Sequence, residues 1–316
     1  MTHHHLPATP ETVRWGHWDG RVPPVLTIKS GDTVTIDTLS GGPADLPDTA
    51  AGFTVLPEHR AVHAAGHPAP GPHFLTGPVA VEGAKAGDVL EVRIKDIKLR
   101  QDWGWNLQAP WLGTLPEDFP ELRRIHVPLD AARGVVTMPW GQELAIRPFF
   151  GNFGVAPPPG WGRLSSKEPR AFGGNMDNKE LAAGAIVYFP VFADGALFSA
   201  GDGHALQGDG EVCVTAIETA LTGTFELILR NDMRLRSPRA ETLATWITMG
   251  FDEDLDDATK MALRDMIALI GELTGLSPQD AYTLCSIAAD LRVTQTVNGN
   301  KGIHCVIERS KLPARR

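Results

Sequence analysis

Apolar and polar residues alternate through much of the first two thirds of the chain. Residues 87–99 show the pattern clearly, because one set of alternating positions is apolar and the other is charged. The two sets are Leu90, Val92 and Ile94 against Glu91, Arg93 and Lys95. Alternate side chains of a strand point to opposite faces. The pattern therefore predicts an antiparallel strand with one face in the core and one in solvent.

Two further segments predict β-hairpins. In residues 25–38 two alternating runs flank a turn at residues 30–32, and in residues 185–202 two apolar runs flank Asp194 and Gly195. An Asp-Gly pair between apolar runs is typical of a tight hairpin turn. Additional strands are predicted over residues 212–218, 224–230 and 302–310.

The hydrophobic period changes near residue 255. Apolar residues then recur every three or four positions, as on one face of a helix: Met261, Leu263, Met266, Leu269, Ile270 and Leu273. Five acidic residues in positions 252–257 precede this run and Gly275 follows it, which marks a helix start and end. Ser277 and Pro278 begin a second predicted helix, which runs through Leu291.

These patterns predict a mainly β fold with a C-terminal helical hairpin, α+β overall. Helices are expected mainly within residues 255–291. We expect a single domain over residues 1–316, with a β-rich part over 1–232 and an α/β part over 233–316. Two long segments rich in glycine and proline, residues 57–78 and 151–174, are expected to form ordered loops that wall a site.

The composition excludes several classes of protein. The chain has 316 residues, of which 42% are hydrophobic and 21% charged, as in ordinary globular proteins. Lys+Arg number 29 against 38 Asp+Glu, and this net charge of -9 disfavours a nucleic-acid partner. The nearly unbroken apolar run at residues 185–193 is far too short to span a membrane. The N-terminus lacks the apolar region of a secretory signal, so a cytoplasmic location is expected.

The richest concentration of chemistry is the segment GDGHALQGDGE at residues 201–211. Asp202 and His204 are two positions apart, as are Asp209 and Glu211, so each pair projects to one face of extended backbone. Asp177 ends a second glycine-rich segment, GGNMD. If these segments converge, the carboxylates cannot all stay ionised without a nearby cation or shared protons. A divalent metal ion would provide that cation. The alternative is a hairpin loop with turn-forming Asp-Gly pairs and a solvent-facing histidine.

Three other features have simple structural interpretations. The Ser-Ser-Lys run at residues 165–167 is interpreted as a solvated loop. His59, His63 and His67 have helical spacing, but the nearby prolines favour a loop over a zinc-binding helix. The tryptophans of the polar loops either line a small dry pocket or seal the loops onto the fold, and the sequence leaves both open. They are Trp103, Trp105, Trp111 and Trp161.

The chain resembles the acetamidase/formamidase family of amide hydrolases over nearly its whole length. The segments that carry the resemblance are THHHLPATPETVRWGHWD, PPVLTIKSGD, GPHFLTGPVAVEGAKAGDVLEV, GGNMD and GDGHALQGDGE, in that order. The resemblance implies a CUB-like β-sandwich and hydrolysis of short aliphatic amides, such as formamide or acetamide, to a carboxylate and ammonia. It also implies a divalent metal (Zn²⁺, often with Ca²⁺) and a homo-oligomer.

The resemblance also assigns site residues. It places a metal-and-carboxylate site at Asp177, Asp202, His204, Asp209 and Glu211, with His73 as a further candidate. Of these we expect metal ligands at Asp177, Asp202, His204 and Asp209, and catalytic groups at Glu211, Asp177 and His73. We expect Glu211 to lie at the start of the next strand. Either Glu211 or Asp177 would act on the attacking water. No serine or cysteine nucleophile with a partner lysine is identified, so water is the expected nucleophile.

Two alternatives remain at this point. The family resembles enzymes that open γ-lactams, so a ring-closed amide is a second substrate class. The other alternative is a non-catalytic β-sandwich that binds a metal or a carbohydrate through its loops, since a fold alone does not imply a function.

Overall fold

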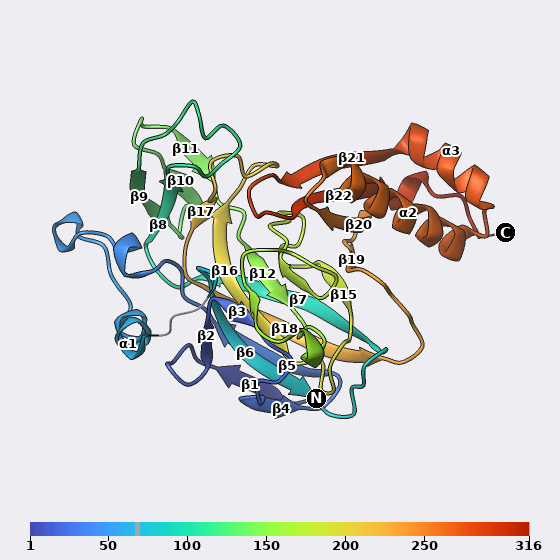
Figure 1. The fold of residues 1–316 in the computed structure, drawn as a ribbon, viewed down its shortest axis with the longest axis horizontal. Coiled ribbons are helices and arrows are strands. Elements are labelled where there is room, and N and C mark those ends of the chain that lie inside the picture. The colour runs from blue at the N-terminus through green and yellow to red at the C-terminus, as the bar shows by residue number, and fades with distance from the viewer. Residues whose placement is uncertain (67–69, 316) are drawn as a thin grey trace.

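The computed structural model describes residues 1–66 and 70–315. Strands make up 39% of the chain and helices 17%, which confirms the predicted mainly β fold with a few helices. Figure 1 shows the strands forming the body of the molecule, with the C-terminal helices α2 and α3 to one side.

One sheet has nine strands among the described residues. Their order is β1 (His3–Leu6), β5 (Asp32–Asp37), β18 (Leu221–Arg230), β7 (Val89–Leu99), β15 (Ile186–Pro190), β19 (Arg239–Glu241), β20 (Thr245–Asp252), β22 (Lys301–Glu308) and β21 (Ala289–Gln295). The sheet therefore joins strands from the N-terminal part of the chain to strands from its last quarter.

A second sheet has eleven strands among the described residues. Eight follow in the order β11 (Glu143–Ala145), β10 (Val135–Thr137), β9 (Arg123–Asp130), β8 (Trp103–Gln108), β17 (Ile217–Glu218), β16 (Phe198–Leu206), β12 (Phe149–Gly154) and β14 (Gly173–Asn175). The other three are β6 (Phe74–Val81), which pairs with β16, and β2 (Val13–Trp15) and β4 (Leu26–Ile28), which pair with β6. A short pair, β3 (His17–Trp18) with β13 (Leu164–Ser165), lies apart from both sheets.

Aromatic side chains join the two large sheets. Phe150 of β12 and Phe198 of β16 pack against Phe225 of β18, with ring centroids 5.5 and 5.3 Å apart. All three rings are fully buried in a core cluster that draws on both sheets. Burial of such large rings is the dominant stabilising term, and here it holds the sheets face to face as a sandwich.

Strand β7 confirms the prediction for the apolar set of alternating positions. Leu90, Val92 and Ile94 are buried, as predicted. Glu91 on the other face is also buried, contrary to the expectation of a solvent face. Its carboxylate accepts hydrogen bonds from Arg93 Nε at 2.7 Å and from Arg230 Nη1 at 2.6 Å, so the charge is paired under the two arginine side chains.

Neither predicted hairpin forms. The runs at residues 25–38 become β4 and β5, and those at 185–202 become β15 and β16, but each pair is split between the two large sheets. In the second case Gly195, Ala196 and Leu197 have successive positive φ angles of 83°, 60° and 59°. Three left-handed residues redirect the chain from one sheet to the other instead of folding it back onto its own strand.

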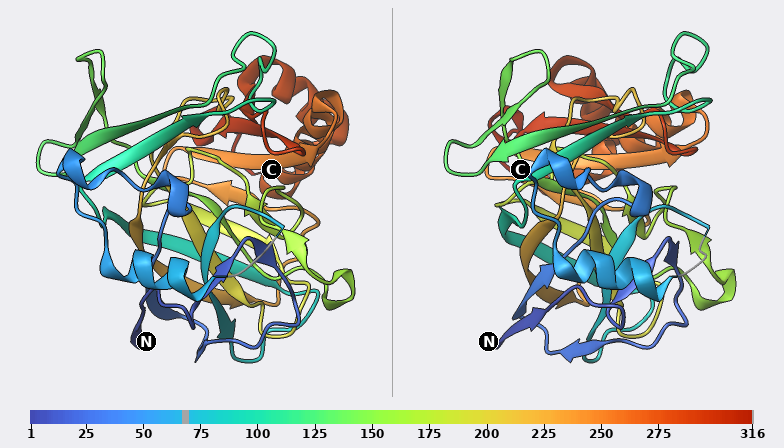
Figure 2. Two further views of the ribbon diagram at one scale, coloured as in Figure 1. Left: turned by 60° about the vertical axis from the view of Figure 1, so that its left-hand side comes forward. Right: turned by 90° about the vertical axis from the view of Figure 1, so that its left-hand side faces the viewer.

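The C-terminal helices match their prediction closely. Helix α2 (Leu255–Thr274) begins where the Asp254 carboxylate accepts from two main-chain N–H groups, and it ends at Gly275, whose φ is 78°. Helix α3 (Pro278–Ala288) begins at the Ser277 cap. Helix α2 packs on β20 and β22, and α3 packs on α2, β21 and β22, with a second core cluster between them. Figure 2 shows these C-terminal elements, coloured orange to red, gathered on one side of the molecule. Residues 289–291 start β21 instead of extending α3.

One helix was not predicted. Helix α1 (Pro57–Ala65) occupies the segment expected to be a loop, since Pro57 stands at its first turn and the prolines that disfavoured a helix lie beyond its end at Gly66. His59 and His63 share a face, but each Nε2 bonds to the Gly41 carbonyl oxygen, at 2.9 and 3.1 Å. His67 lies outside the described residues.

Among residues 1–66 and 70–315, no helix is both long enough and apolar enough to cross a membrane.

Candidate active site

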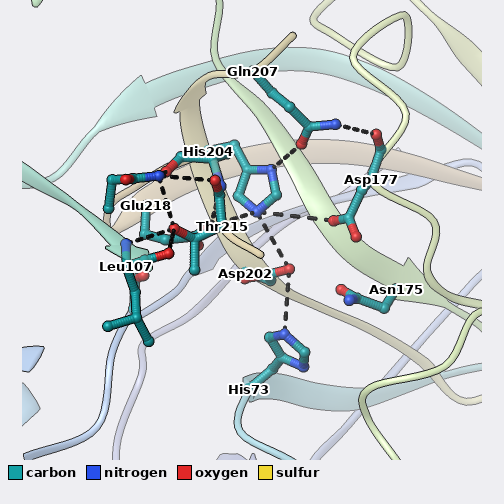
Figure 3. Close-up of polar contacts among 12 residues, drawn as sticks. His73, Leu107, Asn175, Asp177, Asp202, His204, Gln207, Thr215 and Glu218 are labelled. Carbon is teal, nitrogen blue, oxygen red and sulfur yellow. Dashed lines mark hydrogen bonds and ion pairs between the residues drawn. The ribbon is translucent and has the colours of Figure 1, made fainter. Parts of the chain in front are cut away.

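Two neighbouring strands provide the centre of the site. Asp202 and His204 lie on β16, as the spacing predicted, and both are buried. Glu218 of β17 is the direct cross-strand partner of His204. His204 Nε2 lies 3.4 Å from Asp202 Oδ2 and 3.2 Å from Glu218 Oε1 (Figure 3). The antiparallel pairing therefore brings an imidazole between two carboxyl groups.

Two loop residues complete the cluster. Asp177 follows β14, and its Oδ1 lies 3.9 Å from His204 Nε2. Glu211 enters from the turn after Gly210 and offers a carboxylate oxygen within 4.8 Å of ligand atoms of Asp177 and His204. The same limit holds within the set Asp202, His204 and Glu218. His204 thus belongs to two adjoining sets of groups that could hold a metal ion.

A hydrogen-bond relay orients His204. Gln207 Nε2 donates to the main-chain oxygen of Asp177 at 2.7 Å, so Gln207 Oε1 faces His204 Nδ1, 2.9 Å away, and accepts its N–H. In the neutral ring, Nε2 then directs its lone pair toward the carboxyl groups. A proton or a metal cation must lie at that nitrogen, and such a backing hydrogen bond is usual for histidines that bind metals.

The donor set fits a divalent cation. Asp177 Oδ1 and Glu211 Oε2 are buried and have no hydrogen-bond partner. Buried carboxylate oxygens without donors are costly, and a cation would satisfy them. One imidazole nitrogen with several carboxylate oxygens is a ligand set suited to Zn²⁺, and the oxygen-rich part also suits Ca²⁺.

Burial raises the pKa of three carboxyl groups of the cluster, whereas the neighbouring histidines lower the pKa of the fourth. Burial raises the pKa of Asp177 to about 6 and that of Glu218 to about 8. Burial, with the nearby Asp177 charge, also raises the pKa of Glu211 well above its usual range. Burial acts the same way on Asp202, but His73 and His204 outweigh it and hold the Asp202 pKa well below its usual range. Several protons, or one divalent cation, must therefore neutralise the cluster.

The pKa of His204 moves in the direction that this environment requires. Burial alone would lower it, yet the charges of Glu218 and Asp202 raise the pKa of His204 well above its usual range. The site therefore favours positive charge at His204 Nε2, whether a proton or a metal ion supplies it.

Gly151 of β12 leaves the space in front of the cluster open. A Cβ atom at this position would lie 2.4 Å from Asp177 Oδ1, 2.6 Å from Asp202 Oδ2 and 2.7 Å from His204 Cε1. These distances are far below van der Waals contact, so any side chain would displace the ligand groups. The glycine is required by the cluster itself.

Backbone strain gathers at the same place. Asp177, Asp202, Glu211 and Val214 have positive φ angles of 50°, 56°, 43° and 93°. They are four of the seven non-glycine residues with positive φ among the described residues. Such conformations cost about 1–3 kcal/mol each and concentrate at functional sites, where the surrounding structure enforces them.

His73 lines the same cavity as Asp202 and lies beside its carboxylate. Its Nε2 lies 3.7 Å from Asp202 Oδ2, and its Nδ1 lies 2.9 Å from Ser166 Oγ. Ser166 is fully buried, so the interpretation of residues 165–167 as a solvated loop is wrong for this residue. The hydroxyl fixes the His73 ring, and the next residue, Lys167, lines the cavity.

Two expected features of the 201–211 segment differ from the structure. Asp209 is not brought to the cluster, because its carboxylate pairs with Lys179 Nζ at 2.6 Å. Glu211 does not begin a strand; it lies in a turn, and the next strand, β17, starts at Ile217. The turn, in which Glu211 has a positive φ, directs the Glu211 carboxylate toward Asp177 and His204.

The cluster opens into a cavity of about 560 Å³. Its polar end includes His73, Asn175, Asp202, Glu211, Glu218 and Asn298. Of the four loop tryptophans, Trp105 lines this cavity and Trp103 is buried in the fold, whereas Trp111 and Trp161 are exposed. Both interpretations of the tryptophans therefore apply, each to a different residue.

Sequence reasoning missed Glu218, Gln207 and Gly151. Glu218 ends a predicted strand, and Gln207 follows His204 by three positions, so both stood beside the recognised motif. Nothing local distinguished Gly151 from the other glycines, because its importance comes from side chains of three other segments.

A profile of the acetamidase/formamidase family matches residues 4–160 and 164–307. The chain belongs to this family. The formamidase of Methylophilus methylotrophus is 28% identical over 257 residues, which cover 64% of this chain and 60% of that enzyme. The chain also spans less than two thirds of the length of two further curated relatives.

The matches to solved structures extend over nearly the whole of this chain, unlike the matches to the curated relatives. A predicted acetamidase/formamidase from Thermoanaerobacter tengcongensis is 31% identical, with a TM-score of 0.84, and the match covers 98% of this chain and 96% of that one. The acetamidase from Yersinia enterocolitica is 28% identical, with a TM-score of 0.86 and coverage of 98% and 93%. The fold described above is therefore the fold of this family.

Proposed function

We propose that the protein is an amidase, a hydrolase that cleaves the C–N bond of short aliphatic amides such as formamide and acetamide. The products are a carboxylate and ammonia. The observation that carries the proposal is the buried cluster of four carboxyl groups around His204, which opens into a cavity. Membership of the acetamidase/formamidase family supports the same reaction.

His204, Asp202 and Glu218 would hold a divalent metal, with Asp177 beside them. Zn²⁺ is the first candidate because of the imidazole, and Ca²⁺ is the second because of the carboxylates. When bound, such an ion polarises a carbonyl oxygen and makes water more acidic. Asp209 is left out of this ligand set, since it pairs with Lys179.

Glu211 is the proposed general base. Its Oε2 is buried and unpartnered, so it is free to take a proton from a water molecule in the cavity. Asp177 is the second candidate, because its Oδ1 is also unpartnered. The water oxygen bonds to the carbonyl carbon, the C–N bond breaks, and the leaving nitrogen needs a proton. His73, which lies beside Asp202 on the cavity wall, would donate it.

Two other functions are alternatives to be tested. A γ-lactam contains the same amide bond in a ring, and the cavity has room for such a ring. A non-catalytic module that binds metal or carbohydrate would use the cluster without turnover.

The decisive experiment measures ammonia released from formamide and acetamide by metal-replete protein, with and without a chelator. We expect release that the chelator abolishes and that added metal restores. Opening of a lactam without ammonia release would favour the ring-closed substrate. If metal-replete protein hydrolyses neither linear amides nor lactams, the binding module is the better description.

We also propose that the chain is one domain over residues 1–316, that it forms a homo-oligomer and that it acts in the cytoplasm. The nine-stranded sheet supports the first point, because it contains strands from both the 1–232 and the 233–316 parts. Light scattering that gives a mass near 34.1 kDa over a wide concentration range would contradict the oligomer.

A further inference from the structure

The cavity is much larger than the short amides require. Formamide and acetamide contain only a few non-hydrogen atoms, and a water molecule takes about 30 Å³ of liquid volume. A cavity of about 560 Å³ falls in the range that proteins use for ligands of drug-like size, roughly 300–1,000 Å³. A short amide at the polar end would leave most of the space to water.

Most of the remaining side chains that line the cavity are apolar. Its wall is formed by aromatic and aliphatic side chains: Trp15, Leu39, Phe74, Trp105, Leu107, Leu112, Val214 and Val297. Leu39, Phe74 and Trp105 are buried within the fold, and the rings of Trp15 and Phe74 pack at 4.7 Å. The part of the wall formed by Leu39, Phe74 and Trp105 is therefore fixed by packing, whereas Leu112 lies at the exposed rim.

The apolar wall begins directly beside the polar cluster. Trp105 is the cross-strand partner of Glu218, and Phe74 follows His73 in the chain. Asn298, whose side-chain amide donates to Asp177, follows Val297. An amide group held at the cluster would therefore place its acyl group against this wall.

Two polar side chains on this wall, Ser40 and Asp45, are already paired within the protein. Ser40 Oγ accepts from Trp105 Nε1 at 3.3 Å, and Asp45 Oδ1 accepts from Arg124 Nε at 2.9 Å. Lys167 is the one lysine or arginine among the described residues that line the cavity. An acyl group with a remote carboxylate could use Lys167, and this is the competing class of substrate.

We propose that the cavity selects amides whose acyl group carries an aromatic or similarly bulky apolar group. The amide would lie against Asp202, Glu211 and Glu218, the carboxyl groups of the cluster that line the cavity, and the acyl group would lie against Trp105 and Phe74. This inference rests on the proposed amidase function and adds the substrate class to it. Formamide and acetamide are then the poorest members of the series, because they leave the apolar wall unused.

The first test is a substrate series with metal-replete full-length protein: formamide, acetamide, hexanamide, phenylacetamide and succinamate. We expect kcat/KM for phenylacetamide to exceed that for acetamide by tenfold or more. Faster hydrolysis of acetamide or formamide than of phenylacetamide would overturn the inference and leave the proposed function intact. A preference for succinamate would also overturn it, in favour of Lys167. If no amide in the series is hydrolysed, both the proposed function and the inference fail.

The second test changes the wall itself. Leu107 is half-buried on β8 and lines the cavity, so Leu107→Trp narrows the apolar end. The ratio of kcat/KM for phenylacetamide to that for acetamide should fall at least tenfold. Leu243→Trp makes the same change at a residue that is 97% exposed and serves as the matched control.

Thermal unfolding of both tryptophan variants identifies any loss of folding. Calorimetric binding of phenylacetate and acetate, the expected products, gives a readout independent of turnover. Tighter binding of phenylacetate, weakened in Leu107→Trp and not in Leu243→Trp, supports the inference. An unchanged substrate ratio in folded Leu107→Trp would overturn it.

Discussion

Glu218 lies directly opposite His204 in the antiparallel pair of β16 and β17, and its Oε1 is 3.2 Å from His204 Nε2. Directly opposed residues of adjacent strands have their Cβ atoms only about 5 Å apart, so the backbone ladder itself sets the spacing of these two groups. A carboxyl group and an imidazole on rigid strands are well suited to bind an ion, because their side chains are already ordered before the ion binds.

His204→Ala should remove both bound metal and turnover. His204 belongs to both sets of metal-compatible groups, so its loss takes the shared nitrogen ligand from each. Metal content of the purified variant, measured by atomic emission, and ammonia release check this. A variant that retains wild-type metal and turnover would show that the site lies elsewhere.

Glu211→Gln should keep the metal and the fold but lower kcat by roughly 10² or more, the scale of lost general-base catalysis. The amide has the shape of the carboxyl group but cannot take a proton from water. Metal content, circular dichroism and kcat are measured together. Loss of metal in this variant would make Glu211 a ligand and leave Asp177 as the base.

Gly151→Ala should abolish metal binding and lower activity by at least 10². The new Cβ would occupy the space now left between Asp177, Asp202 and His204. Gly160→Ala is the matched control, because a Cβ there meets no heavy atom within 4 Å. Equal metal content in the two variants would contradict the interpretation of Gly151.

Gln207→Leu should weaken metal affinity by about 10- to 100-fold, the usual effect of removing the hydrogen-bond partner of a metal-binding histidine. The leucine cannot accept the Nδ1–H of His204, so the ring loses its fixed orientation. Gln142→Leu, at an exposed position, is the control. Competition with a chelator of known affinity gives the two dissociation constants.

Stability should decline as the pH falls from about 6.5 to about 4, partly because of His59. Burial lowers the pKa of His59 to about 4, whereas the unfolded chain titrates near 6.5. Below pH 6.5 the unfolded state therefore binds more protons than the folded state. Protonation of this residue lowers the free energy of unfolding by at most roughly 3 kcal/mol. His59→Gln should reduce the loss of unfolding free energy between pH 7 and pH 4.5, measured by denaturant titration. An unchanged pH dependence would contradict this, and His5→Gln, on the exposed part of β1, is the control.

The sequence alone determined the elements whose signals are local. The period of apolar residues and the caps at Asp254, Gly275 and Ser277 located α2 and α3, because helix hydrogen bonds join near neighbours. Alternation located β7, because successive side chains of a strand point to opposite faces. The segment containing Asp202 and His204 was recognisable too, since a strand places both residues on one face.

Only the tertiary structure decided which strands pair and which side chains meet. The hairpins expected at residues 25–38 and 185–202 are absent because their strands find partners far along the chain, and turn composition carries no information about such partners. The same non-local pairing brings Glu218 to His204 and Gly151 to the face of the cluster, while an ion pair with Lys179 holds Asp209 away. A motif lists the groups that a site can use, but the packing of distant segments selects among them.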